Sequence, residues 1–259
     1  MHCVVAVPAR LESSRLPGKV LADVDGRPML QRVLECCARA SAPVAVVLCT
    51  DSQDLIDRAG SWGFAALLTS PSCESGSERL ASVADKLIAI VGVSTKDTLI
   101  INVQGDQPFI DPGVIDEMAN EFARRTPTPE VLTPVYRLSA DKLHNPNVVK
   151  TLLNADGRAL YFSRSAIPHV RGVDPADWHT HITYWGHVGI YGYRADVLLH
   201  WNLMPQSLLE KTEKLEQLRL IEAGIQIDTF PVQDEPISVD TLEQLEQARL
   251  FAANRRDCT

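Results

Sequence analysis

The chain lacks long hydrophobic runs, an excess of positive charge and paired cysteine motifs. No stretch approaches the ~18 apolar residues that a membrane-spanning helix needs. Acidic residues outnumber basic ones, 33 against 25, so the formal net charge is -8 and long-range attraction to nucleic acid is not expected. None of the six cysteines forms a CxxC pair, which is typical of buried thiols in a reducing compartment. We therefore expect a soluble, cytoplasmic protein that binds neither membranes nor nucleic acid.

The sequence also lacks a charged N-terminal segment followed by an apolar run, so no signal peptide is expected. Internal repeats and low-complexity tracts are absent as well. What is present is a chain of 259 residues with 45% hydrophobic residues. That length is sufficient for one large core, with or without a smaller lobe.

Short apolar runs alternate with helical spacing through the first half. Strands are predicted at residues 3–7, 44–49, 64–68 and 99–103, and helices at 28–40, from Asp51 or Ser52 to about 60–63, 80–91 and 112–125. This βαβ rhythm predicts a doubly wound, mostly parallel sheet of the α/β class.

The second half favours a smaller, mixed α+β lobe. Strands are predicted there at residues 131–138, 148–153, 159–162, 187–193 and 226–232, and helices at 195–201, 208–223 and 241–253. We expect one domain over residues 1–259, with a core at 1–126 and a smaller lobe at about 131–235. Residues 126–130, with two prolines, are the best candidate connection.

The first candidate site is the loop after the first apolar run, which is expected to end at Pro8. Three cations on this loop, Arg10, Arg15 and Lys19, indicate a bound anion, because ligands of open α/β sheets lie beyond the carboxyl ends of the strands. A triphosphate is the natural candidate. The loop is not a Walker A motif, which needs a glycine at Ser13 and a hydroxyl at Val20. The alternative is a solvated charged loop.

Two aspartates are the candidate metal ligands. Asp106 follows the apolar strand at 99–103, and Asp240 precedes the closing helix. Magnesium prefers one or two carboxylates together with phosphate oxygens, so these side chains would suit a metal on a triphosphate. Each also has a structural alternative, as a turn or helix-capping residue.

Two other constellations have simpler interpretations. His179, His181 and His187 resemble a zinc site if the first two lie on a strand, but surface or interface positions are the alternative. Glu210 and Glu213 are expected on a solvated helix face, balanced by neighbouring lysines.

Eight sequence blocks, in order, resemble one known family. They are PARLESSRLPGK (8–19), SGSERLA (75–81), NVQGDQP (102–108), HNPNVVK (144–150), ALYFSR (159–164), HVGIYGY (187–193), LEQLR (215–219) and SVDT (238–241). Together they resemble the 3-deoxy-manno-octulosonate cytidylyltransferases over nearly the whole chain. The resemblance implies a nucleotide-diphosphosugar transferase-like fold and a homodimer. It also implies transfer of CMP from CTP to the anomeric hydroxyl of the sugar acid Kdo, for lipopolysaccharide synthesis.

The resemblance also implies roles for individual residues. The implied catalytic residues are Arg10, Lys19 and Asp106. The implied nucleotide-binding residues are Ala9, Arg10, Arg15, Lys19, Ser77, Arg79 and Gln104. The implied acceptor-binding residues are Arg164, His187, Tyr191, Glu216 and Gln217. Asp106 and Asp240 would hold Mg²⁺.

One position departs from the family pattern. The family reads Gly-Asp-Glu-Pro where this chain has Gln107 in place of glutamate. The substitution puts a second metal in doubt and suggests an altered acceptor. Two rival functions therefore stay open: the same chemistry on amino-Kdo, another ulosonic acid or a phosphonate, and a nucleotide-binding protein without turnover.

Overall fold

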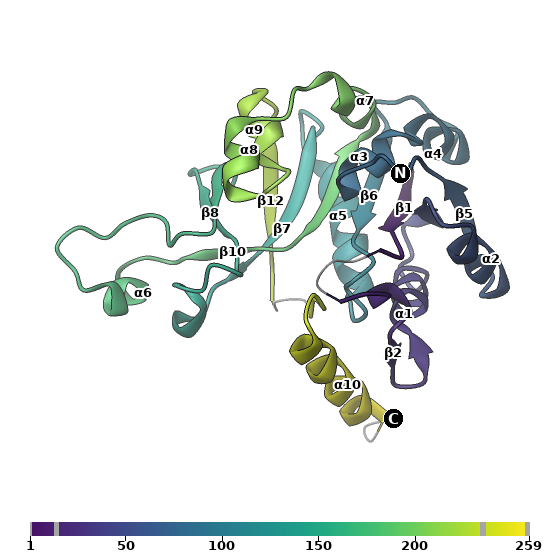
Figure 1. The fold of residues 1–259 in the computed structure, drawn as a ribbon. Helices are drawn as coiled ribbons and strands as arrows, with labels where there is room; N and C mark the ends of the chain where they lie inside the picture. Colours follow the sequence, from purple (N-terminus) through teal and green to yellow (C-terminus); the bar gives the residue numbers. More distant parts are fainter. Residues whose placement is uncertain (1, 13–15, 234–236, 257–259) are drawn as a thin grey trace.

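The computed structural model describes residues 2–12, 16–233 and 237–256. Its described strands form a ten-stranded sheet and a two-stranded ribbon, β2–β3 (Figure 1). The strands are β1 (His2–Ala9), β2 (Asp23–Val24), β3 (Arg27–Pro28), β4 (Pro43–Thr50), β5 (Ala65–Leu68), β6 (Thr98–Val103), β7 (Val131–Arg137), β8 (Lys150–Leu153), β9 (Ala159–Ser163), β10 (Trp185–His187), β11 (Ile190–Arg194) and β12 (Ile227–Val232).

The helices cover both faces of this sheet. They are α1 (Met29–Cys37), α2 (Gln53–Ser61), α3 (Gly76–Ala81), α4 (Ala84–Val91), α5 (Pro112–Arg124), α6 (Trp178–His181), α7 (Ala195–Leu199), α8 (Leu208–Glu213), α9 (Leu218–Glu222) and α10 (Leu242–Arg256). Short 3-10 turns are η1 (Lys19–Leu21), η2 (Ala140–Lys142), η3 (Pro175–Asp177) and η4 (Trp201–Leu203). In the described part of the chain, no helix combines the length and apolarity that crossing a bilayer requires.

Strand β1 shows why the sheet is buried on both faces. Cys3, Val5 and Val7 enter one hydrophobic cluster, with residues of α1, α2 and α5. The alternate residues Val4 and Ala6 enter a second cluster, with residues of α3, α4 and α7. Because successive side chains of a strand point to opposite faces, a nearly continuous apolar run gives both clusters. The predicted doubly wound α/β class is confirmed.

The strand order places a crevice at one edge of the sheet. Strands β5, β4, β1 and β6 are adjacent in that order and all parallel. The chain winds outward from β1 through β4 to β5, and then returns to the other side of β1 as β6. The carboxyl ends of β1 and β6 therefore flank a topological switch point, where open α/β sheets bind ligands.

The second half of the chain continues the same sheet. Strand β11 pairs antiparallel with β6, and β7, β10, β8 and β9 follow in order beyond it, with β12 parallel to β7. The predicted division into a core and a lobe therefore crosses a continuous sheet, and it stays a prediction. Between β9 and β10 the chain extends away from the sheet and carries α6 (Figure 1).

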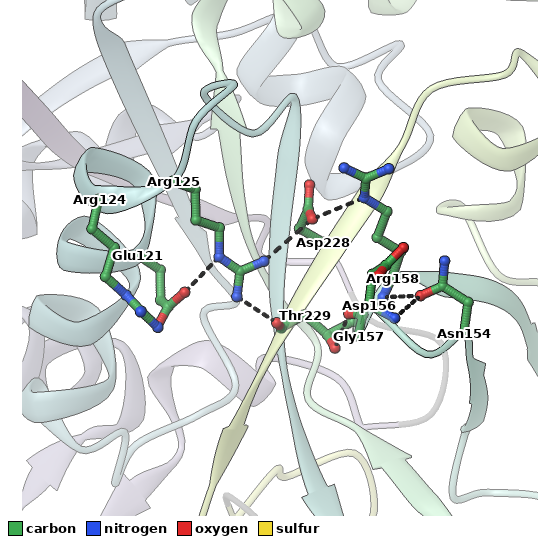
Figure 2. Close-up of polar contacts among 9 residues, drawn as sticks. All are labelled: Glu121, Arg124, Arg125, Asn154, Asp156, Gly157, Arg158, Asp228 and Thr229. Atoms are coloured by element: carbon green, nitrogen blue, oxygen red, sulfur yellow. Dashed lines mark hydrogen bonds and ion pairs between the residues drawn. The ribbon is translucent and has the colours of Figure 1, made fainter.

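A polar network fastens the two halves at the end of α5 (Figure 2). Arg125 donates to the Glu121 carboxylate at 2.6 Å, to Asp228 at 3.2 Å and to the Thr229 carbonyl at 2.8 Å. Arg158, from the turn between β8 and β9, reaches the same Asp228 oxygen at 3.3 Å. One guanidinium thus joins α5 to β12, and a shared carboxylate joins β12 to the β8–β9 turn.

The first strand was expected to end at Pro8, but in the structure it continues to Ala9. Pairing of β1 with β6 ends at Ala6, whereas pairing with β4 runs to Ala9. Pro8 lacks a backbone N–H, and here it lies where β1 has a partner on one side only. A proline is tolerated at such a position.

Three predicted elements are each divided in two. The helix predicted over 80–91 is α3 and α4, separated at Val83, which has an extended φ of −127°. The helix predicted over 208–223 is α8 and α9, separated where Lys214 adopts the left-handed conformation. The strand predicted over 187–193 is β10 and β11, separated by a tight turn in which the Ile190 amide donates to the Val188 carbonyl at 2.7 Å. Hydrophobic spacing is preserved across each break, so periodicity alone does not reveal it.

Candidate active site

Three distant segments meet at the carboxyl ends of β1 and β6. The Lys19 ammonium lies 2.8 Å from Oδ2 of Asp106 and 2.8 Å from Oδ1 of Asp240. The Val239 amide also donates to the Asp106 carbonyl at 2.9 Å, which joins the segment before α10 to the end of β6. The meeting of these three side chains, expected from the sequence, is confirmed.

The electrostatics of this cluster favour the charged form of Lys19. Burial by itself lowers the pKa of Lys19, but attraction to Asp106 and Asp240 outweighs burial, so the pKa lies above its ordinary value. Lys19 therefore stays protonated at neutral pH. One positive charge lies between two carboxylates, and the local charge is negative before any ligand binds.

A cavity of about 280 Å³ surrounds this cluster. The predicted residues that line it are Ala9, Arg10, Lys19, Arg79, Gln104, Asp106 and Asp240. Arg10 is exposed, so its guanidinium is accessible to a ligand. Gly105 lines the cavity and packs closely on β1, since an added Cβ would lie 3.1 Å from the Pro8 carbonyl oxygen. A glycine lets the end of β6 approach β1 closely.

Arg79 has partners within the protein. Its guanidinium donates to Thr69 Oγ1 at 2.5 Å and to Asp51 Oδ2 at 2.9 Å. The side chain is almost fully buried. Arg79 contributes to the wall of the cavity, while its hydrogen bonds hold α3 against the residues that follow β4 and β5. Its role in nucleotide binding stays a prediction.

Ser77 is placed behind the cavity rather than in it. It is 0% exposed, and its hydroxyl is 2.8 Å from the Tyr193 hydroxyl. It lines neither cavity of the site. Arg15, another predicted nucleotide-binding residue, lies outside the described residues.

A second cavity of about 430 Å³ adjoins the first. Four of the five predicted acceptor-binding residues line it: His187, Tyr191, Glu216 and Gln217. Ser75, Gly76 and Gln104 line both cavities and form their shared wall. The break between α8 and α9 turns the chain at Lys214, and this turn brings Glu216 and Gln217 to the cavity.

The second cavity has an unusual set of polar groups. Gln217 is 2% exposed, and its Nε2 atom has no hydrogen-bond partner. Burial raises the pKa of Glu216 above its ordinary value, although hydrogen bonds from Ser75 and Ser77 oppose the shift. An unpartnered buried donor costs free energy, which a ligand with a suitable acceptor atom would recover.

His187 is neutral and has one defined tautomer. Burial lowers the pKa of His187 to about 3. Its Nε2 atom lies 3.0 Å from the hydroxyl of Thr133, which also contacts two backbone carbonyls. Since the hydroxyl hydrogen is needed for a carbonyl, Nε2–H of His187 donates to Thr133, and Nδ1 is left as the ring's acceptor.

Arg164 does not line this cavity. Its guanidinium donates to the carbonyls of Glu213 at 2.8 Å and Pro146 at 3.0 Å. Lys150 lies beside it, fully buried, and donates to three further carbonyls. Both cations hold the loops behind the cavity. A direct contact of Arg164 with the acceptor stays a prediction.

Several other residues differ from expectation. Glu210 was expected on a solvated face, but it is buried, completes a capping box with Ser207 and binds Arg219 through both oxygens. His179 and His181 lie on α6 rather than on a strand, and among the described residues no group of three or more histidine, cysteine or carboxylate side chains is placed to hold a metal ion. The sequence alone did not single out Lys214, which lines the second cavity.

Gln107 is buried next to the second cavity. It is 4% exposed, and its Oε1 atom has no hydrogen-bond partner. A Cβ built on Gly189, which lines the cavity, would lie 3.7 Å from Gln107 Nε2. The one position that departs from the family pattern therefore lies directly behind the cavity wall.

A larger cavity of about 620 Å³ lies elsewhere, near α5 and α10. It is lined mainly by apolar groups such as Phe109, Val188 and Phe251, and none of the predicted site residues contributes to it. We place the site in the two adjoining cavities because they contain the convergent charged and polar groups.

The fold and the charged cavity at the switch point define an α/β protein with a polar ligand site of the kind that open α/β sheets carry. The family model for cytidylyltransferases matches residues 4–227. The chain is 40% identical over 247 residues to the 3-deoxy-manno-octulosonate cytidylyltransferase of Porphyromonas gingivalis, covering 95% of this chain and 94% of the relative. The enzyme of that name from Idiomarina loihiensis is 38% identical over 258 residues, covering 98% and 100%. This chain belongs to the 3-deoxy-manno-octulosonate cytidylyltransferase family.

Solved structures agree with this assignment. A CMP:2-keto-3-deoxy-manno-octonic acid synthetase in complex with CTP matches with a TM-score of 0.88 and 37% identity, covering 98% of this chain and all of the other. A cytidylyltransferase from Leptospira borgpetersenii matches with a TM-score of 0.63 at 16% identity, covering 98% and 87%. The second likeness concerns the fold alone.

Proposed function

We propose that this protein transfers CMP from CTP to the anomeric hydroxyl of Kdo, giving CMP-Kdo and pyrophosphate. The observation that carries the proposal is the wall shared by the two cavities, formed by Ser75, Gly76 and Gln104. A triphosphate beside Lys19 and a sugar acid beside Gln217 would lie next to one another. That arrangement suits direct transfer, without a covalent enzyme intermediate.

The reaction requires cations that offset the negative charge of the triphosphate and of the departing pyrophosphate. The acceptor oxygen attacks the α-phosphorus, the bond to the β-phosphate breaks, and the hydroxyl proton leaves to solvent. Arg10 and Lys19 would bind the phosphates and stabilise charge on the departing pyrophosphate. Arg10 is exposed and Lys19 has a long side chain, so both cationic groups would be able to move with the departing pyrophosphate.

The two aspartates fit a magnesium ion. Both contact the same Lys19 nitrogen at 2.8 Å, so their oxygens are close enough for one cation to bind both. Carboxylate and phosphate oxygens are the ligands that Mg²⁺ prefers. Asp106 and Asp240 would hold the ion, which when bound supplies charge neutralisation of the triphosphate.

The second cavity would hold the sugar acid through hydrogen bonds. His187 Nδ1 accepts a hydrogen bond from a hydroxyl, whereas Gln217 Nε2 donates one to an oxygen. Glu216 and Tyr191 add groups for further hydroxyls. This mixed set suits a polyhydroxylated acceptor better than an apolar one.

The test is incubation with CTP, Mg²⁺ and Kdo, with pyrophosphate release and CMP-Kdo followed by mass spectrometry. A panel containing amino-Kdo, other ulosonic acids and a phosphonate tests the second candidate, which Gln107 favours because it lies behind the acceptor cavity. Turnover with a panel member and none with Kdo would select that candidate. CTP binding without pyrophosphate from any acceptor would select a non-catalytic nucleotide-binding protein.

We also propose a cytoplasmic location, a role in lipopolysaccharide synthesis and a homodimer. The chain between β9 and β10 supports the last point, since it extends from the sheet and buries only a small cluster, Trp178 and Tyr184 with Leu143 of the β7–β8 connection (Figure 1). Light scattering on the purified protein measures the mass directly. A monomer across micromolar concentrations would contradict the dimer.

A further inference from the structure

Lys19 occupies the space between the two carboxylates that are proposed to hold the metal. Its ammonium is 2.8 Å from an oxygen of each, and the Lys19 side chain is only 13% exposed. The distances are those of charge-assisted hydrogen bonds. One protein cation therefore pairs with both aspartates at once.

A divalent cation and this ammonium compete for the same oxygens. A metal ion on Asp106 and Asp240 would lie within a few ångströms of the Lys19 nitrogen, where like charges repel strongly. The ammonium must move before both carboxylates turn to the metal. A triphosphate in the same cavity supplies negative oxygens as new partners for Lys19.

We propose that Lys19 is the counter-ion of Asp106 and Asp240 before a nucleotide binds and so blocks the metal site. The incoming triphosphate then pairs with the Lys19 ammonium and removes it from the two carboxylates. Metal and triphosphate binding are then coupled through one side chain, because each favours the state in which Lys19 has left the aspartates. The inference rests on the proposed function, since it takes Asp106 and Asp240 as the metal ligands.

Contacts that do not involve Lys19 keep the two aspartates together. The Val239 amide donates to the Asp106 carbonyl at 2.9 Å. Val239 is fully buried in a cluster with Val24 and Met29 on one side and Leu245 of α10 on the other. Removing the ammonium should therefore leave the site assembled, so Lys19→Met is an informative variant.

The experiment measures Mn²⁺ binding to nucleotide-free protein by electron paramagnetic resonance. We expect Lys19→Met to bind Mn²⁺ about tenfold more tightly than the unchanged protein, since two ion pairs no longer oppose the metal. Arg10→Met is the matched control: it removes a cation from the same loop at an exposed position. That variant should change Mn²⁺ affinity less than about twofold. Lys19→Arg, which keeps the charge, should stay near the unchanged protein.

A second measurement needs no variant. Lys19 modification by an amine-reactive reagent is followed by peptide mass spectrometry, with and without Mn²⁺. We expect saturating Mn²⁺ to increase Lys19 modification severalfold in the absence of nucleotide, because the metal must displace the ammonium. Modification of the exposed Lys96 should not change.

Equal Mn²⁺ affinity in Lys19→Met and the unchanged protein, or equal gains in Lys19→Met and Arg10→Met, would overturn the inference. Unchanged modification of Lys19 at saturating Mn²⁺ would overturn it as well. If the unchanged protein makes CMP-Kdo and these results are negative, the proposed function stands and the inference fails. If Mn²⁺ binding behaves as expected but no acceptor reacts, the inference stands and the proposed function fails.

Discussion

Lys150 offers a sharp test of how the acceptor cavity is supported. It is 0% exposed and donates to the carbonyls of Asn145 at 2.9 Å, Val148 at 2.7 Å and Arg164 at 2.5 Å. The next residue towards the N-terminus, Val149, lines the second cavity. Replacing Lys150 with methionine keeps the length of the side chain but leaves three carbonyls without this donor.

The expected cost follows from these contacts. Of the three carbonyls, that of Asn145 keeps a hydrogen bond from the Val148 amide. Each of the other two loses a donor at a cost of about 1–3 kcal/mol, which is offset in part because the charge is no longer buried. We expect Lys150→Met to lower the free energy of unfolding by about 2–4 kcal/mol, measured by urea denaturation. The KM for the acceptor should rise more than the KM for CTP, because Val149 contacts only the second cavity.

The pH dependence provides an independent check. Burial, followed by repulsion from Arg164, lowers the pKa of Lys150 from 10.5 to about 8. Below pH 8 both the folded and the unfolded states hold the proton, and the cost of the buried charge is fully present. Above pH 8 the folded state releases its proton first, so the free energy of unfolding should rise by about 1 kcal/mol between pH 7 and pH 9.

This rise should be absent from Lys150→Met and retained in the control Lys96→Met, which changes an exposed lysine. The comparison of the two variants removes the contribution of other titrating groups. A free energy of unfolding with the same pH dependence in Lys150→Met and the unchanged protein would refute the reasoning. An acceptor KM that stays constant in Lys150→Met would refute its positioning role.

Three further predictions concern the site itself. Asp106→Asn keeps the shape of the side chain but removes its charge, and we expect turnover to fall at least about a hundredfold with the fold intact by circular dichroism; a near-normal rate would remove Asp106 from the mechanism. Arg79→Met leaves Asp51 and Thr69 without this partner, so it should lower the free energy of unfolding by about 2–4 kcal/mol. A weaker CTP affinity at unchanged stability would show instead that Arg79 binds the nucleotide. Because the pKa of His187 is lowered to about 3, kcat/KM for the acceptor should show no ionisation of His187 between pH 5.5 and 8; an inflection near pH 6 that disappears in His187→Asn would contradict this.

The pattern of strands and helices in the first half could be predicted because it is local. Continuous apolar runs identified β4 and β6, and Ser52 was one of two expected caps of α2, where its hydroxyl accepts a hydrogen bond from the Leu55 amide. These signals depend on neighbours within a few residues. The breaks at Val83, Lys214 and Val188 were missed because apolar spacing continues across them.

The site was predictable in part for a topological reason. Residues after parallel strands converge at one edge of a sheet, and so Lys19 and Asp106 were expected together. Asp240 lies far away in the sequence, and its expected place depended on the resemblance of its block to the family. The structure confirms that all three meet; their binding of metal and phosphate stays a prediction.

The sequence by itself determined which residues are apolar, which are charged and at what spacing, and this was sufficient for the α/β class and for a charged site at the carboxyl ends of the strands. Only the tertiary structure decided what each polar side chain contacts. Arg79 and Arg164 resembled ligand-binding arginines, yet their guanidinium groups bind Asp51, Thr69 and backbone carbonyls. A hydrogen-bond donor is satisfied by whichever acceptor folding brings near, and many of those acceptors are carbonyls, which every residue has and no sequence pattern marks.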